Sequence, residues 1–155
     1  MYFLSERIRT KESIPADKRF DAVCAEISKK SAYAEEIVEL VMDWINENIK
    51  FKSGQNSVDI ALKNKIGNCT AMSKIACIML RKLGIPTEIV QAKFIGSEGG
   101  HSFVETYFPD AGWIFYDPSN ITRGFLNTNC LLTVGWSYRS GSPEANNWTD
   151  GYFCK

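Results

Sequence analysis

Three residues of the sequence could together carry out nucleophilic thiol chemistry: Cys69, His101 and Asp117. Cys69 follows Gly67-Asn68, a break and then a cap, so it is predicted to lie in the first turn of a helix. Free N–H groups and the helix dipole stabilise a thiolate there. His101 is the only histidine of the sequence and is the natural general base near neutral pH. Asp117 would orient that base.

Each of the three residues also has a purely structural interpretation. An unpaired cysteine is usually a small buried residue, a histidine at a strand start is usually a surface residue, and Asp-Pro is common in turns. Contact between His101 and Asp117 also depends on the register of the hairpin between their strands. A symmetric four-residue loop between Phe108 and Trp113 would put them on opposite faces, whereas a bulge or another closure at Gly112 would put them on one face.

Hydrophobic periodicity predicts the helices that would position these residues. Apolar residues at helical spacing, with acidic residues opposite, predict an amphipathic helix over about 33–49. Ser57 is predicted to cap a short helix that continues through Leu62. The clearest helix begins at Cys69 and stops at Gly84, with Pro86 two residues beyond.

After Pro86 the period changes to two, which indicates strands. We expect strands over 87–95, 101–108 and 113–117, a turn over 109–112 and a short strand over 131–134. The first thirty residues show no clear pattern, although residues 2–9 alternate loosely, as an edge strand does. Helices followed by consecutive antiparallel strands predict the α+β class, with a helix packed on an antiparallel sheet.

The composition is that of an ordinary globular protein. Of the 155 residues 45% are hydrophobic and 23% charged, and 18 Lys and Arg balance 18 Asp and Glu. We therefore interpret residues 1–155 as a single domain and expect no nucleic acid and no membrane as partner. The five scattered cysteines and single histidine predict neither a disulfide framework nor a metal site. We expect no cofactor.

The sequence begins without a signal-peptide core, which favours the cytoplasm, or secretion if a leader has been removed. The oligomeric state stays open.

Four motifs in order resemble the transglutaminase-like family. They are the amphipathic stretch ending Trp44-Ile45-Asn46-Glu47-Asn48-Ile49-Lys50-Phe51; Gly67-Asn68-Cys69-Thr70-Ala71-Met72-Ser73 with Leu80-Arg81-Lys82-Leu83-Gly84-Ile85-Pro86; His101-Ser102-Phe103-Val104-Glu105-Thr106-Tyr107; and Gly112-Trp113 with Asp117-Pro118-Ser119. They span about 33–119. The resemblance implies a papain-like core, in which the nucleophile helix packs on an antiparallel sheet. It also implies a Cys69–His101–Asp117 triad that forms a thioester and passes the acyl group to an amine or to water.

Departures from the family bear on the reaction. Thr70 follows the cysteine where the animal cross-linking enzymes carry Trp, and Phe103 stands where many relatives carry Trp. The calcium-binding and extra β-domains of those enzymes have no room in 155 residues. We therefore expect hydrolysis of a peptide or amide at least as readily as cross-linking, with a peptide or protein as substrate. The alternative is a non-catalytic module of the same fold that binds a peptide or a glycan.

Further residues are candidates for supporting roles. The backbone N–H of Cys69 would hold part of an oxyanion, and Gln55 and Asn68 are both candidates for a second donor. Phe103, Trp113 and Trp136 are candidates for contact with the substrate. For the aromatic residues near the C-terminus, packing over the sheet edge is the alternative role.

Overall fold

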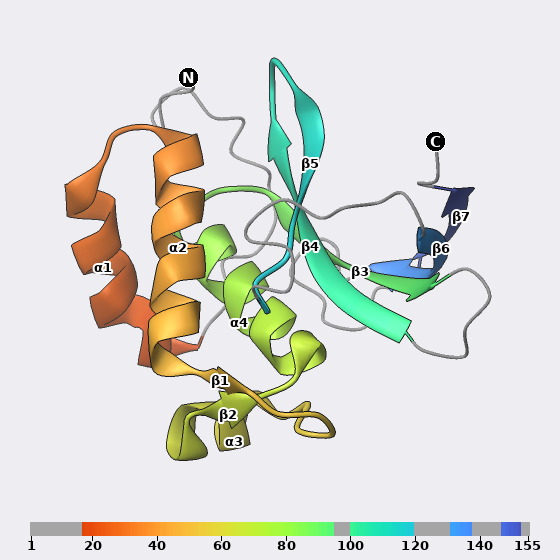
Figure 1. Ribbon diagram of the computed structural model, residues 1–155. Coiled ribbons are helices and arrows are strands. Elements are labelled where there is room, and N and C mark those ends of the chain that lie inside the picture. Colours follow the sequence, from red (N-terminus) through yellow and green to blue (C-terminus); the bar gives the residue numbers. More distant parts are fainter. Residues whose placement is uncertain (1–16, 95–99, 120–130, 138–146, 153–155) are drawn as a thin grey trace.

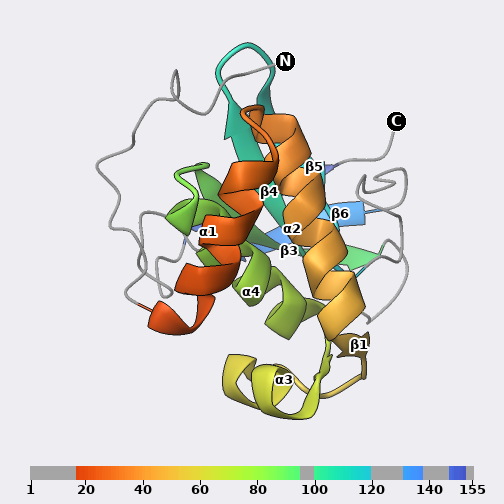
Figure 2. The same cartoon turned by 90° about the vertical axis from the view of Figure 1, so that its left-hand side faces the viewer.

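The structure is a computed structural model, and it describes residues 17–94, 100–119, 131–137 and 147–152 (Figure 1). Helices α1, α2 and α4 gather on one side of a five-stranded sheet (Figure 2). The elements are a 3-10 turn Lys18–Phe20, α1 Asp21–Lys30, α2 Ala34–Asn48, β1 Lys50–Phe51, α3 Val58–Asn64, β2 Ile66–Gly67, α4 Cys69–Lys82, β3 Thr87–Phe94, β4 Gly100–Phe108, β5 Gly112–Tyr116, β6 Leu131–Ser137 and β7 Asn147–Tyr152. The predicted α+β class, with helices on an antiparallel sheet, is confirmed.

Helix α4 lies between the other helices and the sheet, so both of its sides are covered. Its buried side chains include Met72, Ile75, Met79 and Leu80, which join the side chains of α2 in one core. Burial of each such side chain contributes about 1.5–3 kcal/mol. This packing fixes the axis of α4, and therefore the position of its N-terminus, relative to the sheet.

The three predicted helices are confirmed as α2, α3 and α4. Ser57 caps α3, because its Oγ accepts the backbone N–H of Ile60 at 3.3 Å. Helix α1 was not predicted. It buries only Cys24 and Ile27, too few apolar residues for a convincing helical period.

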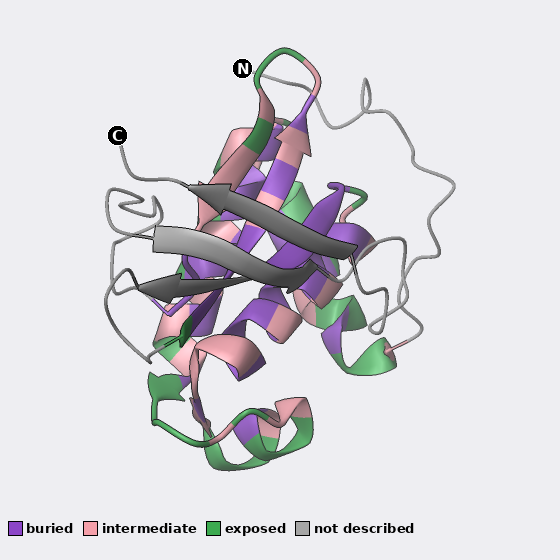
Figure 3. Ribbon diagram, turned by 90° about the vertical axis from the view of Figure 1, so that its right-hand side faces the viewer, coloured by how far each residue is buried: buried purple, intermediate pink, exposed green. Residues whose placement is uncertain are grey.

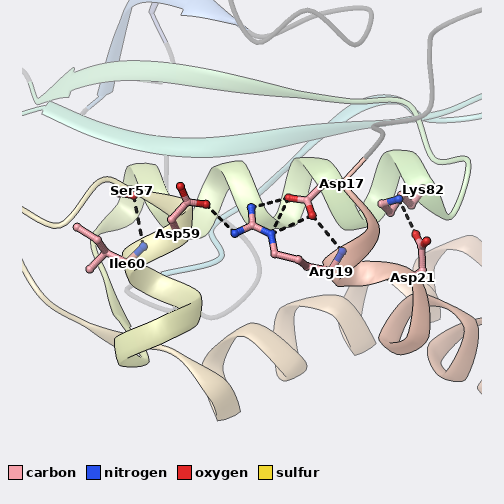
Figure 4. A network of polar contacts seen from close by, with 7 residues as sticks. All are labelled: Asp17, Arg19, Asp21, Ser57, Asp59, Ile60 and Lys82. Atoms are coloured by element: carbon pink, nitrogen blue, oxygen red, sulfur yellow. Dashed lines mark hydrogen bonds and ion pairs between the residues drawn. The ribbon is translucent and has the colours of Figure 1, made fainter.

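Ion pairs near the surface connect the starts and ends of helices (Figure 4). Arg19 contacts Asp17 at 2.7 Å and Asp59 of α3 at 2.6 Å, and Lys82 at the end of α4 contacts Asp21 of α1 at 2.6 Å. Pairs of this kind contribute little each, about 0–1 kcal/mol. Among the helices of the described residues we find none with the length and hydropathy of a membrane span.

The sheet has the strand order β5-β4-β3-β6-β7, and each pair is antiparallel. The predicted strands are confirmed as β3, β4, β5 and β6, whereas β7 was not predicted. Exposed residues gather at the turn between β4 and β5 and around α3 (Figure 3). The loosely alternating residues 2–9 lie outside the described residues.

The hairpin of β4 and β5 settles the register that the sequence left open. Phe108 pairs with Gly112 and Val104 with Tyr116, so three residues, 109–111, form the turn. Gly112 takes part in the ladder with a φ of 74°, a left-handed conformation that favours glycine. Because paired numbers now have an even sum, His101 and Asp117 lie on the same face of the sheet.

A short parallel pair of strands, β1 and β2, precedes α4 and was not predicted. Phe51 pairs with Gly67, and the backbone N–H of Lys52 donates to the Gly67 carbonyl at 2.9 Å. Gly67 is buried, and a Cβ there would meet the Cβ of Ala71 at 3.1 Å and that of Ala61 at 3.3 Å. The absence of a side chain at Gly67 thus lets the chain pass close to α3 and enter α4 directly.

Candidate functional site

Cys69 is the first residue of α4 and is half-buried. Asn68 is the N-cap of the helix, and its Oδ1 accepts the backbone N–H of Ala71 at 3.0 Å. The cap leaves backbone N–H groups of the first turn without helical partners, and the positive end of the helix dipole lies at the thiol. This is the local structure that the sequence predicted for Cys69.

His101 and Asp117 meet at the start of β4 and directly after β5. The His101 Nε2 and the Asp117 Oδ2 are 2.9 Å apart, and the two residues are only 5% and 1% exposed. The ring of His101 stacks on Phe103, with centroids 6.2 Å apart. Burial on all sides leaves the imidazole and the carboxylate little freedom to reorient.

Ser119 holds the second oxygen of Asp117. Its backbone N–H and its hydroxyl both donate to Asp117 Oδ1, at 3.0 and 2.5 Å. The contact fixes the carboxylate so that Oδ2 faces His101. The sequence analysis did not assign this role, although an Asp followed two residues later by Ser is typical of such a local turn.

Cys69 and His101 interact, and each changes the proton affinity of the other. Burial lowers the pKa of His101, but hydrogen bonds to Asp117 and Cys69 outweigh burial and raise that pKa to about 9. Burial raises the pKa of the Cys69 thiol, but hydrogen bonds with the His101 ring and the Ser102 backbone outweigh it, and the pKa lies below the ordinary thiol value. The arrangement favours a thiolate beside an imidazolium.

The structure also brings both oxyanion candidates next to Cys69. The Gln55 carbonyl accepts the backbone N–H of Asn68 at 2.7 Å, so the loop after β1 lies against the start of α4. The Asn68 side-chain oxygen is engaged in the cap. Gln55 is half-buried beside it. Because the cap uses only the oxygen of Asn68, both side chains keep amide N–H groups that could donate to a developing negative charge.

Two predicted substrate contacts are placed elsewhere, and a third stays untested. Phe103 is fully buried, between the ring of His101 and the edge of Phe115, so it supports the histidine and is not a substrate contact. Trp113 is 42% exposed but pairs with Tyr107, six residues along β4 from His101, or about 20 Å. Trp136 pairs with Trp148 in the sheet, but its side chain lies outside the described residues.

The two other cysteines of the described part of the chain are structural. Cys24 is buried, its Sγ lies 3.8 Å from the Met79 carbonyl, and burial raises its pKa to about 11. Cys77 is buried and its Sγ lies 3.4 Å from the Thr87 carbonyl. Cys69 differs from both in its partial exposure, and from Cys24 also in its lowered pKa. Within the same described ranges, no cluster of three or more His, Cys, Asp or Glu could hold a metal ion.

Comparisons with known proteins agree with this fold. YebA, an uncharacterized protein of Bacillus subtilis (strain 168), is 30% identical over 145 residues, which cover 80% of this chain and 18% of YebA. A candidate cysteine protease from Cytophaga hutchinsonii superposes with a TM-score of 0.66 at 18% identity, covering 90% of this chain and 50% of that one. The periplasmic domain of TgpA from Pseudomonas aeruginosa gives 0.58 at 22% identity, covering 70% and 44%. The chain thus spans half or less of the length of each of these proteins.

LapG of Legionella pneumophila shares the fold as well, with a TM-score of 0.61 at 18% identity and coverage of 79% of this chain and 75% of LapG. The family model of the transglutaminase-like superfamily matches residues 21–118. That range runs from α1 to the residue after Asp117, and so includes Cys69, His101 and Asp117. The chain belongs to the transglutaminase-like superfamily.

Proposed function

We propose that the protein hydrolyses an amide or peptide bond through a thioester on Cys69. The observation that carries the proposal is the buried His101–Asp117 pair, 2.9 Å apart, at a thiol of lowered pKa on a helix N-terminus. A nucleophile, a base and a group that orients the base are the three parts that acyl transfer to a thiol requires.

In the first step the Cys69 thiolate attacks the carbonyl carbon of the substrate and forms a C–S bond. The tetrahedral intermediate collapses as the C–N bond breaks, and protonated His101 gives its proton to the leaving amine. His101 then takes a proton from water, whose oxygen attacks the thioester. The acid product leaves, the thiolate is restored, and Asp117 stabilises the charged form of His101 throughout.

The intermediate carries a negative oxygen that needs donors. The backbone N–H of Cys69, at the start of α4, is one donor. We propose the Gln55 side-chain amide as the second, because the 2.7 Å backbone contact with Asn68 keeps that residue at the nucleophile. A pair of donors in place before reaction lowers the barrier without reorganisation.

Two observations favour water over an amine as the acceptor. Thr70 follows Cys69, whereas the animal cross-linking enzymes of the family carry Trp after the cysteine. A fold neighbour of known structure is a candidate cysteine protease. Transfer to an amine would use the same thioester, so the acceptor is an experimental question.

The test is mass spectrometry of a mixed peptide library after incubation with the protein, with and without an added primary amine. We expect peptides that are cleaved with addition of water or deamidated with release of ammonia, few amine adducts, and no products with Cys69→Ser. Cys77→Ser is the matched control, because it alters a thiol of the same helix away from the site. If amine adducts were the main product, the proposed hydrolysis would be wrong and the reaction would be transamidation. Binding of peptides without any product would favour the non-catalytic module.

A further inference from the structure

Two hydroxyl groups lie beside the thiol and the imidazole, on the next residue of each element. Thr70 follows Cys69 in α4, and Ser102 follows His101 in β4. The Thr70 Oγ1 and the Ser102 Oγ are 2.9 Å apart. Ser102 is 1% exposed, and a buried hydroxyl without a partner would be costly. This contact is a side-chain bridge between the nucleophile helix and the histidine strand.

Both residues of the bridge also touch the sulfur. The Thr70 hydroxyl and the Ser102 backbone N–H form hydrogen bonds with Cys69. A hydroxyl has one proton and can accept as well as donate. If the Thr70 proton goes to the sulfur, its oxygen is left to accept the Ser102 proton. That direction satisfies both hydroxyls and presents two donors to the sulfur.

We propose that Thr70 and Ser102 are positioning residues, whose hydroxyl bridge holds the Cys69 sulfur within reach of His101 and stabilises its anionic form. The inference rests on the proposed function, in which that anion is the nucleophile. It assigns a role to Thr70, the residue that departs from the cross-linking enzymes. Thr70 places at that position a hydroxyl that can donate to the sulfur and at the same time accept from Ser102.

The charged groups around Cys69 differ in kind from the neutral Thr70 and Ser102. His101 on β4 forms a hydrogen bond with Cys69, and Asp117 beyond it supports the charge of the imidazole. Lys74, one turn further along α4, points its Nζ toward the Asn56 carbonyl at 3.4 Å. Thr70 and Ser102 are neutral, so their contribution is a hydrogen bond and not a charge. It should persist at high salt, where exposed charges are screened.

The test is the pH dependence of Cys69 alkylation by iodoacetamide, followed for that peptide by mass spectrometry in the folded protein. We expect Thr70→Val to raise the apparent pKa of Cys69 by about one unit, a tenfold change in the ionisation equilibrium. Ser102→Ala should raise it by less, and the double variant by little more than Thr70→Val, because both residues belong to one bridge. Thr70→Ser, which keeps the hydroxyl, should restore the wild-type profile.

Matched controls separate the bridge from general loss of packing. Thr106→Val removes a buried hydroxyl from the same strand as Ser102, and Ser73→Ala removes one from the same helix as Thr70; neither should move the profile. Equal shifts in Thr70→Val and Thr106→Val would overturn the inference, as would a wild-type profile in both Thr70→Val and Ser102→Ala. If the wild-type protein cleaves nothing but the profile shifts as expected, the proposed function fails and the bridge stands.

Discussion

The chemistry of single residues depends on how the buried charges are paired. His101 is held between Asp117 and Cys69, with Phe103 beneath the ring and Ser119 behind the carboxylate. The residue types were readable in the sequence, because a lone histidine and a cysteine after a cap are distinctive. The supporting roles of Phe103 and Ser119 could not be predicted from the sequence, because these roles depend on which side chains the fold brings beside them.

Replacement of Asp117 by Asn should abolish most of the activity. The amide cannot stabilise the imidazolium and favours the wrong tautomer of His101, so we expect kcat to fall about 10³- to 10⁴-fold. The fall in kcat can be measured with an activated ester as substrate. Asp110→Asn, at an exposed turn residue, is the matched control and should retain full activity. Comparable rates for the two variants would remove Asp117 from the mechanism.

Substitution of the two side-chain amides near Cys69, Gln55 and Asn68, should have different effects. Gln55→Ala should lower kcat about 10²-fold with little change in KM, because a donor to the oxyanion acts only in the transition state. Asn68→Ala should lower the free energy of unfolding by about 1 kcal/mol, because the cap of α4 is lost. Steady-state kinetics measure kcat and KM, and urea unfolding measures the free energy of unfolding. An unchanged kcat in Gln55→Ala would exclude Gln55 as an oxyanion donor.

At the scale of elements, the site is made by one helix end and one hairpin. The sequence predicted α4 with its cap, since Asn68, Gly84 and Pro86 are strong boundary signals. The sequence could not decide the register of the β4–β5 hairpin, because residues 109–112 are compatible with a turn of three or of four residues. The positive φ of Gly112 decides it. The strands β1 and β2 are two residues each, too short to leave a period.

Gly112→Ala should therefore weaken the hairpin. No atom lies within 4 Å of the added Cβ, so only backbone strain acts, and we expect a loss of about 1 kcal/mol. Gly54→Ala is the matched control, with a φ of 83° and similar open space, and should cost about as much by urea unfolding. Only Gly112→Ala should also lower activity, because it alone acts on the register that joins His101 to Asp117. Full activity in a destabilised Gly112→Ala variant would show that the register tolerates the strain.

The whole molecule buries the His101–Asp117 pair within the packing of helices on a sheet, which couples the free energy of unfolding to pH. The sequence predicted the class and most of this packing from periodicity alone. Helix α1 was not predicted, because only one side of it meets the core. The pairing of β3 with β6 joins segments that lie far apart in the sequence, and such long-range pairing leaves no local signal.

The coupling to pH can be measured once the thiol is removed. Cys69→Ala keeps the Asp117 contact, which is the largest of the influences that raise the pKa of His101 against the lowering by burial. We therefore expect that pKa to stay above its unfolded value of about 6.5. The stabilising proton is therefore bound below that pH, and stability is lost as the pH rises through the folded pKa. We expect the free energy of unfolding to fall by about 1–3 kcal/mol over that range. Urea unfolding across the range measures it; in Cys69→Ala with Asp117→Asn the fall should disappear, and its persistence would assign it to another group.

The central claim, that Cys69 is an acyl-accepting nucleophile activated by His101, can be tested by trapping the intermediate. The protein is mixed with an activated acyl ester, quenched in acid and digested, and the acyl group is located by mass spectrometry. We predict one acyl group on Cys69, formed much faster than on Cys24 or Cys77, and a large loss of this rate in His101→Asn. Acylation of Cys69 at the rate of an ordinary exposed thiol, unaffected by His101→Asn, would contradict the account.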